Sequence, residues 1–206
     1  MRPDDPELLR LLRRIYRGVW GYDVGPADAA RVERSGGAET YGEIRPAAAA
    51  RLLAHLRLGP SDVLYDLGSG TGRFALHAAL GTRVGRVVGV ELARARHEAA
   101  VAARAAARAA GRRRADRLEL RCADLLRVSL ADATVVYCCD TAFPEPFLAR
   151  LARKVARARP GLRFVSTAPL DPSPRLALEE VLRLDMSWRR RSKTYLYRVA
   201  AGGRSR

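Results

Sequence analysis

The chain has 206 residues, of which 48% are apolar and 29% are charged. These values are typical of one globular domain and exclude a wholly disordered or collagen-like chain. No run of about 18 apolar residues is present, so we expect no membrane-spanning helix and no membrane partner. Three cysteines, two of them adjacent, provide no disulfide framework and indicate a reducing compartment.

The formal net charge is +16, an excess that favours polyanionic partners such as nucleic acid or nucleosomes. Nearly all of this charge is arginine, since Lys154 and Lys193 are the only lysines. A GC-rich genome also produces such a bias, so a merely solvated basic surface is the alternative interpretation.

The first 40 residues are predicted to form a short helical appendage and linker. Residues 1–20 have Pro6 in a first helical turn, followed by leucines at helical spacing. Residues 21–40 are rich in glycine, alanine and polar residues, which predicts a loop. Early acidic residues and the lack of a long apolar stretch argue against a secretory signal.

From residue 46 onward, helical and strand patterns alternate. Helices are predicted at 46–58, 73–80, 92–110 and 146–159, and strands at 62–68, 86–91, 117–122, 133–138 and 162–168. Two further strands, 181–188 and 194–200, follow each other without a helix, which predicts a terminal antiparallel hairpin. The predicted fold is α/β: a seven-stranded, mostly parallel sheet with helices on both faces, over residues 41–200. Residues 201–206 are predicted to be a basic tail.

A glycine-rich turn follows the strand at 62–67. Asp66 is followed by Gly68, Gly70 and Gly72, after which a helix begins. Such glycines let the chain turn sharply and let backbone N–H groups approach a ligand closely. Arg73 follows directly, so the pattern departs from the nicotinamide fingerprint GxGxxG, and the GK[ST] of a phosphate-binding P-loop is absent.

Two acidic residues follow the next two strands. Glu91 ends the second strand about 20 residues after the glycine turn, where an acid can accept hydrogen bonds from both ribose hydroxyls of a nucleoside. Asp124 follows the third strand, where it can accept from an adenine amino group. This combination is similar to class I S-adenosylmethionine methyltransferases. The alternatives are a plain strand–helix turn with a surface glutamate, and an ordinary loop aspartate.

Further motifs narrow the resemblance. These are TYGE at 40–43, TAF at 141–143, VSTAP at 165–169, and SW at 187–188, seven residues before YLY at 195–197. In order and spacing, over about residues 38–200, the chain resembles the disruptor-of-telomeric-silencing family. Its members are non-SET lysine methyltransferases that modify a lysine on the globular face of histone H3.

The resemblance implies S-adenosylmethionine as cofactor and assigns roles around it. Tyr41 and Glu43 would lie in a loop that closes on the methionine end of the cofactor, where a carboxylate could pair with its ammonium group. Asp66 and the glycine turn would line the methionine side. Glu91 would hold the ribose and Asp124 the adenine. No metal is expected, because the three histidines lack ligand-type spacing.

The resemblance also implies an aromatic channel for the acceptor lysine. Its walls would be Phe143, Trp188 and Tyr195, since aromatic rings desolvate an aliphatic stem and attract an amine. Ordinary core packing is the alternative for all three.

The substrate side departs most from the family. Cys139 and Asp140 replace an Asn-Asn pair, Thr141 replaces the aromatic before AF, and Arg73 replaces a glutamine. Asp140 is predicted to orient the amine or take its proton, and Cys139 to be a small polar wall.

The implied function is a protein-lysine methyltransferase that acts on histone H3 in chromatin. Its partners would be histone or nucleosome, with DNA backbone contacts through basic patches such as the turn 189–193, and its location nuclear. A non-histone lysine or a small-molecule amine is the alternative acceptor, with a cytoplasmic location. A catalytically inactive nucleic-acid-binding module is the third possibility, and oligomeric state is left open.

Overall fold

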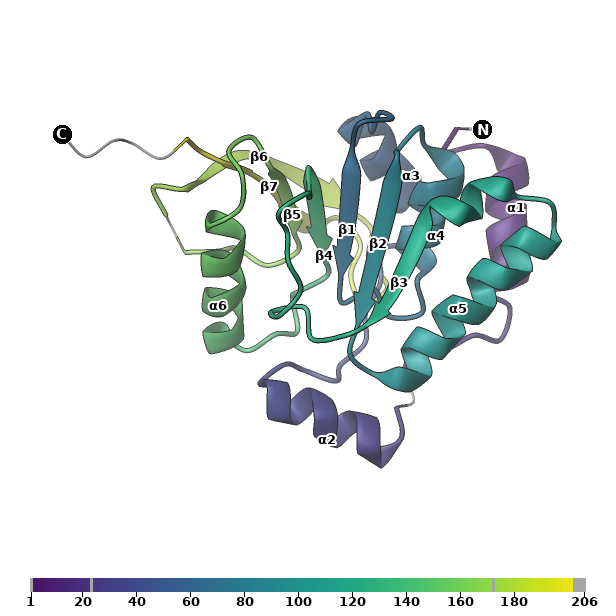
Figure 1. Cartoon of the computed structure of the whole chain (residues 1–206), viewed down its shortest axis with the longest axis horizontal. Coiled ribbons are helices and arrows are strands. Elements are labelled where there is room, and N and C mark those ends of the chain that lie inside the picture. Colours follow the sequence, from purple (N-terminus) through teal and green to yellow (C-terminus); the bar gives the residue numbers. More distant parts are fainter. Residues whose placement is uncertain (1, 23, 172, 202–206) are drawn as a thin grey trace.

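A mixed β-sheet covered by helices on both faces forms the protein (Figure 1), in a computed structural model that describes residues 2–22, 24–171 and 173–201. The strands of this described part are β1 (Val63–Leu67), β2 (Arg86–Glu91), β3 (Leu118–Cys122), β4 (Val135–Cys138), β5 (Arg163–Ser166), β6 (Leu176–Leu184) and β7 (Ser192–Val199). Their order in the sheet is β3-β2-β1-β4-β5-β7-β6. Strands β1 to β5 run parallel, whereas β7 is antiparallel to β5 and β6. The predicted fold is therefore confirmed, including the terminal hairpin.

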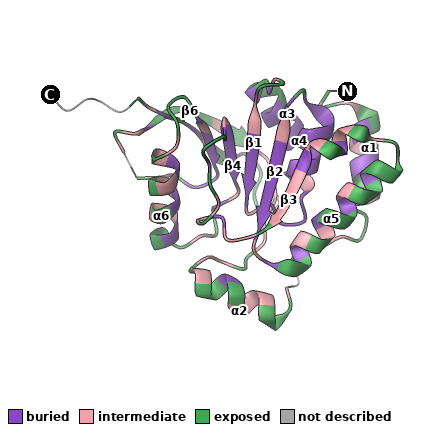
Figure 2. Cartoon of the chain, viewed as in Figure 1, coloured by how far each residue is buried: buried purple, intermediate pink, exposed green. Residues whose placement is uncertain are grey.

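The central strands are short apolar runs because both of their faces are covered. Figure 2 shows them buried, while the helices expose their outer sides. Strand β6 lies at the edge of the sheet and most of its residues are exposed. It begins at Leu176, five residues before the predicted start, and ends at Leu184, so Trp188 lies in the connection to β7. Its polar residues give no strand-like alternation, and pairing with β7 determines its length.

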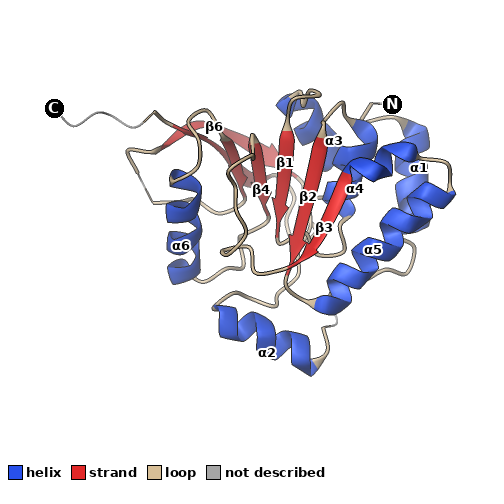
Figure 3. Cartoon of the chain, in the orientation of Figure 1, coloured by secondary structure: helices blue, strands red, loops and turns tan. Residues whose placement is uncertain are grey.

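Helices cover the two faces unequally (Figure 3). They are α1 (Pro6–Ile15), α2 (Pro26–Ser35), α3 (Pro46–Leu56), α4 (Arg73–Gly81), α5 (Arg94–Ala109) and α6 (Glu145–Ala156), with a 3-10 turn, η1, at Arg113–Arg117. Side chains of α1, α3, α4 and α5 share one hydrophobic cluster with the sheet, whereas α6 packs on the opposite face. None of the helices in the described residues is long and apolar enough to cross a membrane.

Helix α1 is part of the main core. Asp5 caps its N-terminus, since the Asp5 side chain accepts a hydrogen bond of 2.8 Å from the backbone N–H of Glu7. Leu8, Leu11 and Leu12 recur at helical spacing and are buried in the same cluster as α3 and α4.

Residues 26–35 form helix α2, so the prediction of a loop over residues 21–40 is wrong for this stretch. Pro26 occupies the first turn, and Gly36, with φ +79°, ends the helix in the left-handed conformation. Val32 is its only buried residue among those described. With so small an apolar face, the glycines on either side of the helix suggested a loop. The predicted basic tail lies outside the described residues from position 202 onward.

We predict that Leu8→Ala destabilises the whole domain. The Leu8 side chain is fully buried and lies against the position of Gly81 in α4. Removing it leaves a cavity that costs about 2–5 kcal/mol of unfolding free energy, measured by urea denaturation. Leu9→Ala, at the half-buried neighbouring position, is the control and should cost less. Equal losses in the two variants would contradict the docking of α1.

Candidate functional site

A pocket opens at the carboxyl ends of the central strands. The sheet order reverses between β1 and β4, and in open α/β sheets ligands bind at such a switch point. Its floor comes from the segments after β1, β2 and β3 and from the end of β4. The lining residues of these segments are Asp66, Gly68, Ser69, Gly70, Val90, Glu91, Leu92, Ala123, Asp124, Leu125, Tyr137 and Cys139.

The glycine turn is held in a conformation that other residues rarely adopt. Gly68, Gly70 and Gly72 have φ angles of +76°, +54° and +77°. The backbone N–H of Gly68 donates to the carbonyl of Val90 over 2.9 Å, which ties the turn to β2. A Cβ at Gly70 would lie 2.6 Å from the ring of Tyr41. Glycine is therefore required both for the backbone conformation and for space.

Glu91 links the two sides of the pocket floor. Its Oε2 accepts from the N–H of Gly70 and its Oε1 from the N–H of Ala93, each over 2.8 Å. Each carboxylate oxygen can accept a second hydrogen bond, so Glu91 remains able to bind hydroxyl groups. Asp124 lines the pocket farther along, where its Oδ1 accepts from the N–H of Leu126 over 2.8 Å.

Asp66 is a buried carboxylate with an unused oxygen. Its side chain is 2% exposed, and its Oδ2 has no hydrogen-bond partner among the described residues. Burial, and then the nearby negative charge of Glu91, raise the pKa of Asp66 to about 8. The Oγ of Ser69 is likewise buried without a partner. A cationic, polar ligand fits this corner, because it would satisfy Oδ2 and favour the ionised carboxylate.

The segment 40–43 lies directly on the glycine turn. The hydroxyl of Tyr41 donates to Glu43 Oε2 over 2.9 Å and lies 3.1 Å from the Thr71 hydroxyl. Arg73 Nε is 3.2 Å from the same oxygen of Glu43. The structure thus brings the predicted residues Tyr41 and Glu43 to the turn, and Glu43 is paired there with a cation.

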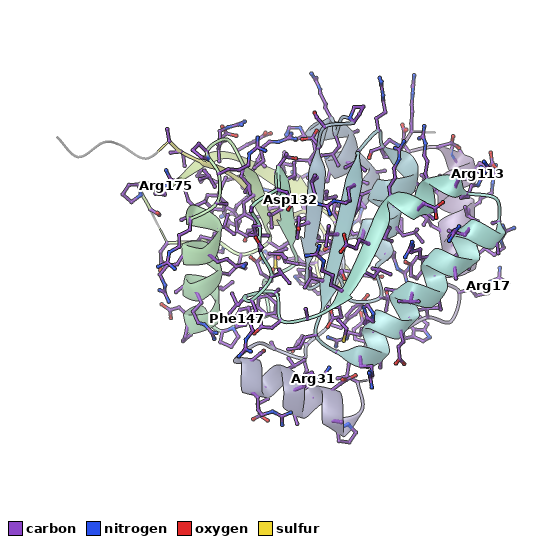
Figure 4. The ribbon with its side chains drawn as sticks, in the orientation of Figure 1. Arg17, Arg31, Arg113, Asp132, Phe147 and Arg175 are labelled. Carbon is purple, nitrogen blue, oxygen red and sulfur yellow. The ribbon has the colours of Figure 1, made fainter. Side chains whose placement is uncertain are left out.

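Helix α2 forms a cover over the pocket, to which it contributes Val32 and Ser35. Arg31, labelled in Figure 4, donates to the carbonyl of Leu92 over 3.4 Å. Asp28 Oδ2 accepts from the N–H of Ala95 over 2.8 Å, at the start of α5. On the far side, Arg150 donates to the carbonyl of Ser35 over 3.1 Å. A ligand of this pocket would therefore be enclosed by a helix that sequence analysis missed.

Besides helix α2, the sequence analysis also missed Arg96. It is buried, and its guanidinium donates to the carbonyls of Gly21 and Glu39, which stand on either side of α2. The guanidinium carbon also lies 5.1 Å from the centre of the Tyr41 ring. Its position in the sequence could have indicated that Arg96 is buried, because it lies on the same helix face as the buried Ala100 and Ala103.

Two predicted substrate-side residues line the pocket. The ring of Phe143 lies 4.6 Å from that of Phe147, centre to centre. The thiol of Cys139 donates to the carbonyl of Gly42 over 3.4 Å, and burial raises its pKa to about 12. Cys139 therefore stays a neutral thiol, as a polar wall rather than a nucleophile.

The other two predicted channel aromatics do not line this pocket. Trp188 is 43% exposed and its ring lies against Gly42, where a Cβ would be only 2.5 Å away. Tyr195 stacks on Tyr197 at 6.3 Å and packs with the cluster on the α6 face. Trp188 thus lies beside Gly42 of the pocket wall, and Tyr195 packs against the same hydrophobic cluster as Phe143, so the channel of three rings stays a prediction.

Asp140 also departs from its predicted role. It is fully buried, and its Oδ1 accepts from the N–H groups of Thr167 and Ala168 over 2.8 Å each. Its Oδ2 accepts from the hydroxyl of Ser166 over 2.7 Å. Burial raises its pKa to about 6, although these hydrogen bonds oppose the shift. Asp140 thus ties the ends of β4 and β5 together, and it does not belong to the described lining of the pocket.

No cluster of three potential metal ligands occurs among the described residues. His77 is buried with its Nε2 2.7 Å from the carbonyl of Pro3, and His55 pairs with Glu180.

We predict that the protein becomes less stable as the pH rises from about 6 to 8. The folded state keeps a proton on Asp66 up to about pH 8, whereas the unfolded chain loses it near pH 4, so raising the pH favours unfolding. The loss is about 2 kcal/mol over this interval. Asp66→Asn should flatten the pH dependence in urea denaturation, whereas Asp4→Asn, at an exposed position, should not. Parallel profiles for wild type and Asp66→Asn would show that this carboxyl is ionised throughout.

The sequence was compared with models of protein families and with the sequences of known proteins. The family described as "Histone methylation protein DOT1" matches residues 26–185. A Caenorhabditis elegans histone-lysine N-methyltransferase, H3 lysine-79 specific, is 39% identical over 67 residues, 32% of this chain and 7% of the relative. A Candida albicans protein of the same description is 38% identical over 71 residues, 34% of this chain and 5% of the relative. The matches thus span less than a tenth of either relative.

Solved structures support the fold. An RNA methyltransferase from Salinibacter ruber, in complex with S-adenosyl-L-homocysteine, is 26% identical with a TM-score of 0.59, and the match covers 79% of this chain and 95% of that one. The putative methyltransferase yhhF from Escherichia coli has a TM-score of 0.58 at 13% identity, over 76% of this chain and 87% of that one.

Proposed function

The chain belongs to the DOT1 histone methylation family, and from this premise we propose that it is an S-adenosylmethionine-dependent protein-lysine N-methyltransferase whose acceptor is a core lysine of histone H3. The observation that carries the proposal is the pocket at the switch point, where the glycine turn, Glu91 and the unpartnered oxygen of Asp66 meet. The matched part of the chain includes this whole region.

Different residues of the pocket would bind different parts of the cofactor. Glu91 would accept hydrogen bonds from the ribose hydroxyls, and Asp124 from the adenine amino group. Asp66, rather than Glu43, would face the ammonium group, since Asp66 Oδ2 is buried without a partner among the described residues, whereas Glu43 is paired with Arg73. Arg73, at the start of α4 and inside the pocket, would attract the carboxylate. When bound, S-adenosylmethionine supplies an activated methyl group on a sulfonium.

The chain's part in methyl transfer is orientation and exclusion of water. An acceptor lysine must be neutral, and entry into a pocket walled by Phe143 and Cys139 lowers its pKa by desolvation. Asp140 is not assigned as a base, because it is fully buried and does not belong to the described lining of the pocket. The amine proton would therefore leave to water before the methyl group is transferred.

A histone acceptor would place the protein on chromatin in the nucleus, with nucleosomal DNA close by. Support for this comes from the two relatives specific for H3 lysine-79 and from the net charge of +16. The turn before β7 adds three exposed arginines, Arg189, Arg190 and Arg191, which we propose contact the DNA backbone.

A non-histone lysine or a small amine in the cytoplasm is the second candidate acceptor. The observation that favours it is that neither Trp188 nor Tyr195 belongs to the described lining of the pocket, because a histone-type lysine channel was expected to use both rings. An inactive nucleic-acid-binding module is disfavoured by the intact glycine turn and Glu91.

We predict that Glu91→Ala weakens S-adenosylmethionine binding. Losing two charge-assisted hydrogen bonds to the ribose costs about 2–4 kcal/mol, or roughly 30- to 900-fold in Kd by calorimetry. Glu98→Ala removes an equal charge from the exposed side of α5 and serves as the control. Glu91→Gln keeps one acceptor oxygen for the backbone and guards against misfolding. Wild-type affinity in a folded Glu91→Ala protein would contradict the proposed site.

Methyl transfer from radiolabelled S-adenosylmethionine tests the acceptor. We expect label on histone H3 when nucleosomes are offered, and none with the Glu91→Ala variant. Core histones, free amines and RNA are offered in parallel. Labelling of amines or RNA alone would move the proposal to the second candidate or beyond it, and no labelling of any acceptor would indicate a binding module.

A further inference from the structure

A second groove lies outside the pocket described above, between α6 and the segment 126–131. One wall consists of Leu126, Ser129, Leu130 and Ala131, and the other of Arg150, Arg153, Lys154, Arg157, Ala158 and Arg159. Five of these ten residues are cationic. None of the described lining residues is acidic or aromatic.

The arginines of this groove lack ion-pair partners among the residues that the structure describes. Arg150, Arg153 and Arg157 recur at spacings of three and four, so they share one face of α6. None of the groove arginines forms an ion pair with the described residues, and Arg153, Arg157 and Arg159 are exposed. Like charges at such spacing destabilise a helix. An anionic partner would remove that repulsion.

Lys154 extends the charge into the groove. Its Nζ donates to the carbonyls of Leu126 and Val128 and so joins α6 to the opposite wall. Burial lowers its pKa. This side chain joins the two walls of the groove, while Arg153, Arg157 and Arg159 are exposed along its rim.

The residue types that line the groove indicate which kind of polyanion it would bind. None of the exposed large hydrophobic residues lies in the groove, so nothing there would insert into a membrane. The absence of aromatic residues among the described lining disfavours single strands, whose bases stack on aromatic rings. Arginine and lysine along a concave surface suit regularly spaced phosphates. We propose that the groove between α6 and residues 126–131 binds the phosphodiester backbone of double-stranded nucleic acid.

The groove adjoins the cofactor pocket. Leu125 lines the pocket and Leu126 the groove. Arg150 lines the groove while its guanidinium donates to Ser35 in the α2 cover. A bound duplex would therefore lie beside the pocket mouth. This inference goes beyond the proposed acceptor and does not depend on it, since a duplex would bind whichever amine is methylated.

Salt-dependent binding of a short DNA duplex of mixed sequence tests the groove. Fluorescence anisotropy from 50 to 200 mM salt gives the slope of log affinity against log salt, which reports the number of phosphates contacted. Arg153→Ala/Arg157→Ala should make this slope shallower by up to about two units. Arg10→Ala/Arg14→Ala, on α1, removes the same charge from a different helix and should leave it close to wild type. Equal effects of the two double variants would overturn the proposal.

Three further measurements test whether the effect is specific to the groove and to a duplex. Vesicles containing phosphatidylserine replace the duplex in a second arm, and loss of vesicle binding alone in Arg153→Ala/Arg157→Ala would overturn the proposal in favour of a lipid surface. Arg153→Lys/Arg157→Lys should restore the slope if the helix is intact, because lysine keeps the charge. Calorimetry with S-adenosylmethionine should give the wild-type affinity for every variant, which separates failure of the groove from failure of the proposed function.

Discussion

The rest of the site depends on the two hydrogen bonds that the carboxylate of Glu91 accepts from the backbone. The carboxylate accepts from Gly70 on one side and Ala93 on the other, and so joins the glycine turn to the start of α5. Without it, two buried N–H groups would lack partners. Burial raises the pKa of Asp66, and the charge of Glu91 adds to this shift. Glu91 thus contributes both to the shape and to the electrostatics of the pocket floor.

Segments from the N-terminal part of the chain pack around the glycine turn. Tyr16, at the end of α1, donates to the carbonyl of Thr71, and Tyr41 reaches the Thr71 side chain. The guanidinium of Arg73 lies 4.5 Å from the Tyr16 ring centre and pairs with Glu43. These contacts place the end of α1 and the segment 40–43 around a single turn. The site therefore needs chain segments far apart in the sequence.

Local patterns predicted those parts of the structure that depend on local sequence. The buried strands were found from their apolar runs, and the hairpin from two strand patterns without a helix between them. The glycine turn and Glu91 were found because their spacing follows from a strand–turn–helix–strand unit. The family resemblance drawn from these motifs is confirmed by the match over residues 26–185. Helix α2 was missed, since its few apolar residues give almost no periodic signal.

Tertiary burial decided the remaining positions. Asp140 has the spacing of a substrate-side residue, yet the end of β5 surrounds it with donors. Arg96 looks like one more surface arginine until the carbonyls on either side of α2 approach it. Trp188 and Tyr195 were grouped by sequence, but the early end of β6 leaves Trp188 in the connection and Tyr195 on the α6 face. None of these environments is encoded within a few residues.

A crystal structure with S-adenosyl-L-homocysteine tests the central claim most directly. The account predicts ribose hydroxyls within about 3.2 Å of Glu91 and the ammonium group at a similar distance from Asp66 Oδ2, with α2 over the ligand. A ligand bound elsewhere, or one whose ribose makes no hydrogen bond to Glu91, would contradict it.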